Sequence, residues 1–142
     1  PDLNDRLYTS YYQKLPADFA TRSEDKSADN FIDAIKLYNE NKYREAIIEF
    51  NKTLKTDPSN NAARLFLGIC YTETGNFEKA SEQFNQIIYL GDSLFEEHAA
   101  WYLSLCYVKT RRVEKARPLL TKLVDTRSFY MGKASDLLKK LK

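Results

Sequence analysis

The residue best suited to acid–base chemistry is His98, the only histidine of the chain. A hydrolytic site would pair it with a nucleophile and an orienting acid, but the sequence has no GxSxG or similar nucleophile motif. Glu96 and Glu97 precede it at the start of an expected helix, which suits a residue on the surface or at the edge of a groove. One histidine with scattered carboxylates is not a recognisable metal site either. We therefore predict a protein that is not an enzyme and has no catalytic, metal-binding or cofactor-binding residues.

The composition favours one helical domain. The 142 residues are 43% hydrophobic, 30% charged and 13% aromatic, a balance typical of globular proteins. Four glycines and four prolines are too few for a turn-rich β fold. No apolar run of about 18 residues is present, and no signal peptide is visible. The chain opens at Pro1 without an initiator Met, which leaves room for an upstream segment.

The charge is unevenly distributed along the chain. Residues 101–142 carry 11 basic and three acidic residues, whereas residues 1–100 carry 11 basic and 17 acidic ones. A solvated basic end accounts for this, and so does a patch for an acidic partner, for anionic lipid or for nucleic acid. Because no recognised nucleic-acid motif accompanies the charge, we do not expect nucleic acid as a partner.

The main signal is an internal repeat. The segment "AIKLYNENKYREAIIEFNKTLKTDP" recurs after a shift of 34 residues and again after a further 36. The small residues that coincide are Ala34, Gly68 and Ser104 in one row and Ala46, Ala80 and Ala116 in another. Large residues also coincide when the copies are aligned, with Tyr71 and Tyr107 in one row and Phe50, Phe84 and Leu120 in another.

Each copy is predicted to form two helices joined by a short turn, because its apolar residues recur every three or four positions. The first helices are expected at about 30–40, 62–74 and 95–109, and the second at about 43–56, 77–90 and 113–124. Asp57-Pro58 separates the first two copies, since proline cannot continue a helix. The small residues are expected at the helix crossings, where a bulky side chain would force the axes beyond 8–10 Å.

This small–large pattern, the 34-residue period and Pro58 together resemble the tetratricopeptide repeat. The resemblance covers about residues 27–124 and implies a right-handed all-α solenoid of three helix pairs. Two positions depart from the pattern: Asp33 stands where a large apolar residue is preferred, and Pro118 falls inside a helix. We predict an N-terminal aromatic arm and loop (1–26), three repeats (about 27–60, 61–94 and 97–127) and a C-terminal capping helix (128–142).

The ends of the chain extend the resemblance. The arm is expected to be a short helix or an extended segment from Leu3 to Lys14. "LYTSYY" and "WYLSLCYVK" are similar to segments of Bacteroidetes proteins whose repeats commonly follow a single membrane-spanning helix. That likeness implies a bacterial protein tethered outside the cytoplasm, in the periplasm; without it, a cytoplasmic protein is expected.

Family geometry implies a concave face lined by the first helix of each pair, and this face is the expected binding groove for a protein or peptide. Its predicted residues are apolar and aromatic with a polar edge: Phe31, Ile35, Tyr38, Asn39, Leu65, Ile69, Thr72, Glu73, Trp101, Leu105, Val108 and Lys109. Groove residues that clamp a terminal carboxylate are Lys, Arg and Asn, so this type of binding is not expected here.

An apolar groove of this kind needs a cover. The arm offers matching bulk through Leu7, Tyr8, Tyr11, Tyr12 and Phe19, while a second copy or a foreign peptide would also serve. We predict a non-catalytic scaffold for protein–protein interaction, monomeric or weakly oligomeric. The alternative is an assembly unit that associates through its acidic front and basic back.

Cys70 and Cys106 are the only cysteines and occupy the same position in two repeats. Neither belongs to a CxxC pair, so metal ligation by thiolates is not expected. Equivalent residues on neighbouring units should lie about 8–10 Å apart, too far for a disulfide. We predict two free thiols.

Overall fold

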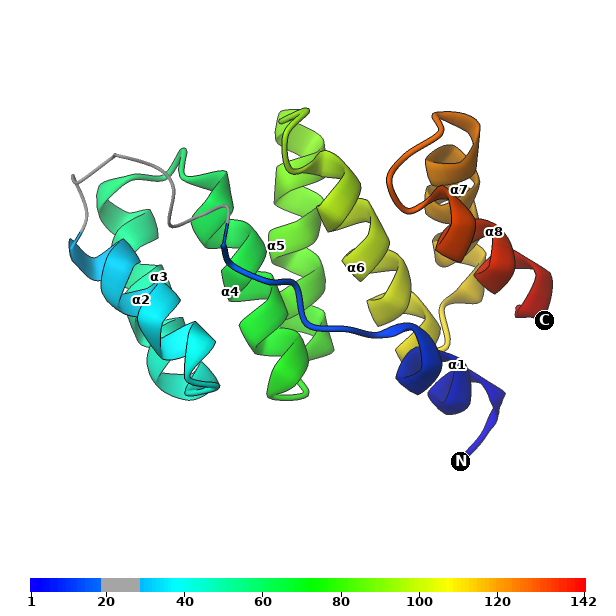
Figure 1. Cartoon of the computed structure of the whole chain (residues 1–142), viewed down its shortest axis with the longest axis horizontal. Coiled ribbons are helices and arrows are strands. Elements are labelled where there is room, and N and C mark those ends of the chain that lie inside the picture. The colour runs from blue at the N-terminus through cyan, green and yellow to red at the C-terminus, as the bar shows by residue number, and fades with distance from the viewer. Residues whose placement is uncertain (19–28) are drawn as a thin grey trace. The chain divides into compact units, whose positions relative to one another are not determined.

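The computed structural model describes residues 1–18 and 29–142 (Figure 1). All regular structure in these ranges is helical, in eight helices. They are α1 (Leu3–Tyr11), α2 (Asp29–Asn39), α3 (Tyr43–Thr56), α4 (Asn61–Glu73), α5 (Phe77–Leu90), α6 (Glu96–Lys109), α7 (Val113–Asp125) and α8 (Met131–Lys140). The six repeat helices begin and end within one residue of their predicted bounds, and the all-α helical-repeat fold is confirmed.

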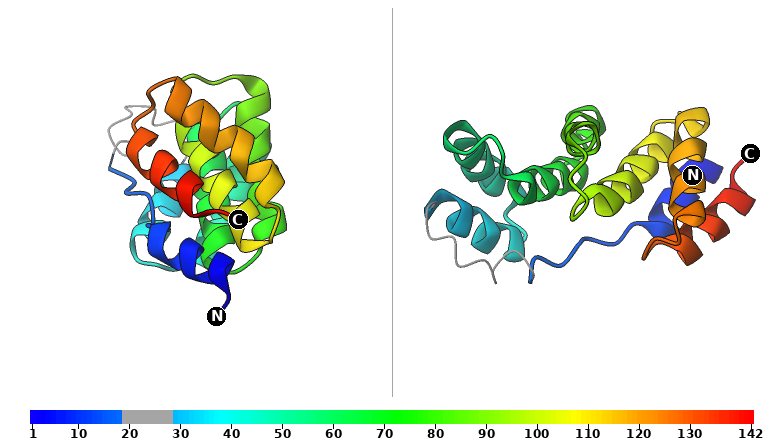
Figure 2. Two further views of the ribbon diagram at one scale, coloured as in Figure 1. Left: turned by 90° about the vertical axis from the view of Figure 1, so that its right-hand side faces the viewer. Right: turned by 90° about the horizontal axis from the view of Figure 1, so that it is seen from above.

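The helices form two compact units. The central unit comprises residues 14–83, and the terminal unit comprises residues 1–13 and 84–142, so the boundary falls within α5. In the central unit α3 packs against α2 and α4. In the terminal unit α7 packs against α6 and α8, and α1 packs against the same two helices (Figure 2). The division into three repeats stays a prediction. No helix of the described ranges is both long and apolar enough to cross a membrane.

Each helix pair turns at one residue with a left-handed backbone. These residues are Asn41 (φ 61°), Gly75 (φ 80°) and Arg111 (φ 63°), which are separated by the same 34 and 36 residues as the sequence repeat. At each turn the amide of this residue and the amide of the next residue donate to carbonyls in the last turn of the first helix; in the middle turn Gly75 N donates to Thr72 O at 3.1 Å. This geometry satisfies the carbonyls that a helix end leaves free.

A contact between successive helix pairs also repeats. In the central unit Asn51 Nδ2 donates to Tyr71 Oη at 3.4 Å. In the terminal unit Asn85 Nδ2 donates to Tyr107 Oη at 3.3 Å. The two tyrosines are half-buried, so their rings pack while their hydroxyls stay accessible to these amides. The repeat is therefore visible in side-chain contacts as well as in helix spacing.

The small residues predicted at the helix crossings are buried. Ala34, Ala46, Ala80 and Ala116 are completely inaccessible. Ser104 is equally buried, and its hydroxyl donates to the Ala100 carbonyl at 2.8 Å, so its burial leaves no polar atom unsatisfied. The large residues that follow them along the chain, Phe50, Phe84 and Leu120, are also fully buried. α7 continues from Val113 to Asp125 through Pro118, whose ring is exposed.

The turns after α5 and α7 give a matched test of backbone strain. Gly91 (φ 69°) and Arg127 (φ 54°) occupy equivalent positions 36 residues apart, and both are exposed. Because side chains with a Cβ disfavour this conformation, Arg127→Gly should raise the free energy of unfolding by about 0.5–1 kcal/mol, and Gly91→Ala should lower it by a similar amount. Urea denaturation of both variants measures this, and equal effects of the same sign would contradict it.

The thiols give a second test. Cys70 and Cys106 are both fully buried thiols, as predicted. Burial raises the pKa of Cys70 to about 12. Because the thiolate is the reactive form, we expect both thiols to resist a disulfide reagent at pH 8 and to react in full in denaturant. Rapid reaction of the folded chain, followed by absorbance, would contradict this packing.

Candidate functional site

The predicted groove residues of the central unit are mostly buried. Tyr38, Leu65 and Ile69 are fully buried, and Ile35 and Thr72 nearly so. The Thr72 hydroxyl donates to the Gly68 carbonyl at 2.9 Å, which makes it part of α4 and leaves its oxygen engaged. Phe31 and Glu73 are half-exposed and Asn39 is exposed. The accessible groove residues of this unit are therefore Phe31, Asn39 and Glu73.

The terminal unit shows the same gradient. Leu105 and Val108 are fully buried, and Trp101 is 1% exposed, whereas Lys109 is half-exposed. The Trp101 ring stacks on Tyr130 at 5.3 Å and meets the edge of Tyr11 at 6.4 Å. One of the predicted groove residues is therefore in contact with the N-terminal arm.

Acidic residues of α1 hold basic residues at the end of α6. Asp5 Oδ1 lies 2.9 Å from Lys109 Nζ, and Arg111 pairs with Asp2 and, at 3.6 Å, with Asp5. Asp2 also caps α1, since its side chain accepts from the Asp5 amide. That amide and the Arg111 guanidinium hold the pKa of the Asp2 carboxyl below its ordinary value. We call this cluster, Asp2, Asp5, Lys109 and Arg111, the arm latch.

Aromatic residues continue the contact beyond the arm latch. The Tyr12 ring meets the edge of Tyr102 at 5.9 Å, and Tyr102 Oη donates to the Gln13 carbonyl at 2.5 Å. The Tyr11 hydroxyl donates to Asp136 of α8. Leu7 is 6% exposed. Of the arm residues predicted to cover the groove, Phe19 lies outside the described residues.

The chain continues without helix from Tyr12 to Ala17, and in the central unit its Lys14 enters a polar and aromatic site. Lys14 Nζ donates to the Tyr38 carbonyl at 2.6 Å and to Asn41 Oδ1 at 2.7 Å. The same ammonium lies 4.1 Å from the centre of the Tyr38 ring and 4.9 Å from that of Tyr43. We call Tyr38, Asn41, Tyr43 and Glu73 the ammonium site.

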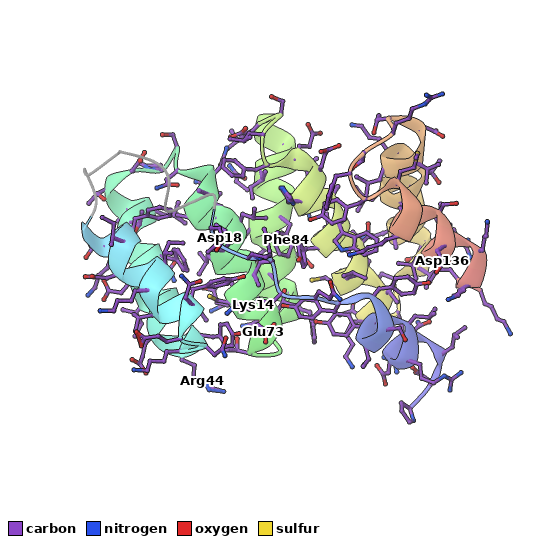
Figure 3. The ribbon with its side chains drawn as sticks, in the orientation of Figure 1. Lys14, Asp18, Arg44, Glu73, Phe84 and Asp136 are labelled. Atoms are coloured by element: carbon purple, nitrogen blue, oxygen red, sulfur yellow. The ribbon has the colours of Figure 1, made fainter. Side chains whose placement is uncertain are left out.

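Glu73, the last residue of α4, contributes charge to this site (Figure 3). Burial lowers the pKa of Lys14, and the carboxylate of Glu73 opposes that shift. Burial and the same carboxylate raise the pKa of the Tyr43 hydroxyl. The Lys14 amine therefore lies over the rings of Tyr38 and Tyr43, and Glu73 acts on its charge.

Tyr38 also fixes the backbone next to Lys14. Its hydroxyl donates to the Leu15 carbonyl at 2.5 Å, so one tyrosine binds the arm through its ring, its carbonyl and its hydroxyl. Leu15 is 8% exposed and Ala17 is 1% exposed, whereas Pro16 between them is exposed. Alternate residues of this segment are thus buried.

His98, the candidate for acid–base chemistry, packs against an aromatic residue. Its Nδ1 lies 2.6 Å from Tyr130 Oη, and burial lowers the pKa of the imidazole, so His98 is neutral at pH 7. Within residues 1–18 and 29–142 no three His, Cys, Asp or Glu residues come together as metal ligands would. The half-buried position agrees with a residue at the edge of a packed face.

The terminal unit also has a pocket away from these contacts. It measures about 270 Å³, and its lining includes both apolar residues and the charged residues Glu96, Glu97 and Lys122. Its apolar residues are Ile88, Ala100, Leu119 and Leu123. None of the 12 predicted groove residues lines it, and no predicted arm residue does.

Most of the polar residues that join the arm to the helices were missed in the sequence analysis. They are Asp2, Asp5 and Lys14 of the arm and Asn41, Tyr43, Tyr102, Arg111 and Asp136 of the rest of the chain. A partial signal existed in the acidic start of the arm and the basic turn after α6. No signal in the sequence pointed to Lys14, because its partners include a main-chain carbonyl and a turn residue.

The carboxyls that hold the arm predict a pH dependence. The pKa of Asp2 is lowered as described above, and that of Asp136 is lowered by hydrogen bonds from Tyr11 and Lys140. A lowered pKa stabilises the folded chain above the ordinary value of 3.8, and this stability is lost as the pH falls through the folded pKa.

Asp2→Asn with Asp136→Asn should therefore unfold more easily than the wild type at pH 7, and the difference should vanish at pH 2–3. Asn at position 2 can still cap α1, so the change isolates the charge. Urea denaturation at the two pH values measures this; a difference independent of pH would contradict it.

The comparisons with known proteins agree with the geometry. Residues 37–92 match the family model described as tetratricopeptide repeat. Neither the curated proteins nor the solved structures contain a match to this chain. The matched range runs from α2 to the turn after α5 and includes the left-handed turns at Asn41 and Gly75. The described residues are all-helical in their regular structure, and residues 37–92 are similar to the tetratricopeptide repeat.

Proposed function

We propose that this chain is a non-catalytic scaffold for protein–protein interaction whose peptide-binding residues are covered by its own N-terminal arm. Tetratricopeptide repeats generally mediate protein–protein interaction, and residues 37–92 match that family. The observation that carries the proposal is that residues of the arm contact predicted groove residues in each unit. Lys14 contacts Tyr38 in the central unit, and Tyr11 and Asp5 contact Trp101 and Lys109 in the terminal unit.

The covering contacts suit a displaceable segment. The arm latch is partly solvated, with side chains 29–55% exposed. Ion pairs at this exposure contribute about 0–1 kcal/mol each, and salt screens them. The ion pairs of the arm latch therefore add only a modest free energy against a partner that competes for the covered residues.

Other features of the proposal concern the setting of the scaffold. A membrane tether upstream of Pro1 stays a prediction, and so does a location in the periplasm. Self-association through opposite charges also stays a prediction; the arm latch pairs two acidic and two basic residues within one chain, which leaves fewer of these charges for a second copy.

Charge reversal within the arm tests the proposal while leaving the covered residues unchanged. Asp2→Lys with Asp5→Lys should break the arm latch and remove the cap of α1, at a cost of about 1 kcal/mol. The released arm should increase the binding of a hydrophobic dye. A partner that needs the covered residues should bind about fivefold more tightly, the factor that corresponds to 1 kcal/mol.

Affinity capture from the source organism with quantitative mass spectrometry measures this gain. Asp33→Lys with Glu45→Lys changes two exposed carboxylates of the repeats by the same net charge and serves as the control. A partner specific to the released arm is enriched over both the wild type and this control. If the dye reports release and no protein gains affinity, the arm does not compete with a partner and the proposal fails.

A further inference from the structure

The ammonium site has the composition of a receptor for a lysine side chain. It offers two oxygen acceptors within 2.7 Å of Nζ, two aromatic faces within 4.9 Å and the carboxylate of Glu73. Tyr38 lies one residue before the end of α2 and Glu73 is the last residue of α4, so two helix C-termini meet the cation. Helix C-termini favour positive charge, and ammonium over a phenol ring is attracted by the ring quadrupole.

The residues after Lys14 define further positions of the same site. The Tyr38 hydroxyl fixes the Leu15 carbonyl, and the Leu15 side chain is 8% exposed. Pro16 faces solvent, and Ala17 is 1% exposed, so the last position has room for a small side chain only. The bound segment therefore has a fixed pattern, which is lysine, a branched apolar residue, any residue and a small residue.

We propose that the ammonium site and its neighbours bind a segment of a partner protein with this pattern, and that residues Lys14–Ala17 occupy the site as an internal substitute. The proposal rests on the scaffold function above and specifies which partner chemistry the central unit recognises. We propose lysine as the first residue of the bound segment, because both polar atoms that contact Nζ are hydrogen-bond acceptors.

A partner protein fits the site better than a second copy of this chain. A tethered segment has an effective concentration in the millimolar range. The arm of a second copy carries the same residues, so at micromolar concentration it loses to the tethered arm. A partner escapes this limit because it can add contacts that Lys14–Ala17 does not make.

The experiment vacates the site in the full chain. Leu15→Asp places a charge at a buried position and should expel Lys14–Ala17 while the arm latch stays intact. The probe is a fluorescent peptide with the sequence of residues 12–18, blocked at both ends, and anisotropy measures its binding. We expect saturable binding to the Leu15→Asp chain and binding at least about tenfold weaker to the wild type, where the tethered arm competes.

Matched peptides and one matched protein variant measure how much the lysine side chain contributes to peptide binding. Replacing the peptide's lysine by methionine should weaken binding by about tenfold or more, since charge-assisted hydrogen bonds are lost. Replacing its proline by serine should have no effect, because that position is exposed. Asn41→Gly in the Leu15→Asp chain keeps the left-handed turn and removes one acceptor, so it should weaken the lysine peptide and leave the methionine peptide unchanged.

Three results overturn the inference: equal binding of the lysine and methionine peptides, no saturable binding at millimolar peptide, or an arm-exchanged dimer of the wild type that is tighter than the peptide complex. If Leu15→Asp does not fold, Lys14→Ala with Leu15→Ala replaces it, judged by circular dichroism. In the unmodified chain, excess lysine peptide should also shift the side-chain amide resonance of Asn41.

The two proposals fail separately. If the lysine and methionine peptides bind equally but the chain with a released arm captures a partner, the scaffold function stands and the lysine specificity is refuted. If the peptide binds through its lysine but the chain with a released arm captures no partner, the site binds lysine and the proposed competition between arm and partner is refuted.

Discussion

The close approach of neighbouring helices is the constraint on which the rest of the structure depends. Two α-helices pack at 8–10 Å only where the residues between their axes are small. Ala34, Ala46, Ala80, Ser104 and Ala116 are completely buried, and so are the large residues Phe50, Phe84 and Leu120. Because the spacing recurs after 34 and 36 residues, one packing solution is used several times along the chain.

This arrangement separates stability from recognition. The buried rows hold each helix pair together, and the polar ends of the first helices stay partly accessible, as Asn39, Glu73 and Lys109 show. The arm contacts these ends through charged and aromatic groups, whereas the crossings themselves use alanine and serine. A change in the arm should therefore alter what the covered residues can bind without altering the helix pairs.

The repeat helices could be predicted almost to the residue, because their signal is long and periodic. Each small residue fixes a register, and Pro58 and Gly75 mark helix ends. The contacts of the arm could not be predicted in the same way. Lys14 donates to a main-chain carbonyl and to the side-chain oxygen of a turn residue, and neither acceptor produces a periodic pattern in the sequence. The arm latch joins residues more than 100 positions apart. The groove itself stays a prediction, and most of its apolar residues are packed within their units.

The left-handed turn between the two helices of a pair has different contacts in each helix pair. Between α4 and α5 it is Gly75, which has no side chain, whereas Asn41 between α2 and α3 binds Lys14 and Arg111 between α6 and α7 binds Asp2. The backbone there is set by the turn, and the side chain is not part of the core. The identity of this single residue therefore decides whether the turn can bind the N-terminal arm, and every side chain with a Cβ at this position carries the cost of a left-handed backbone.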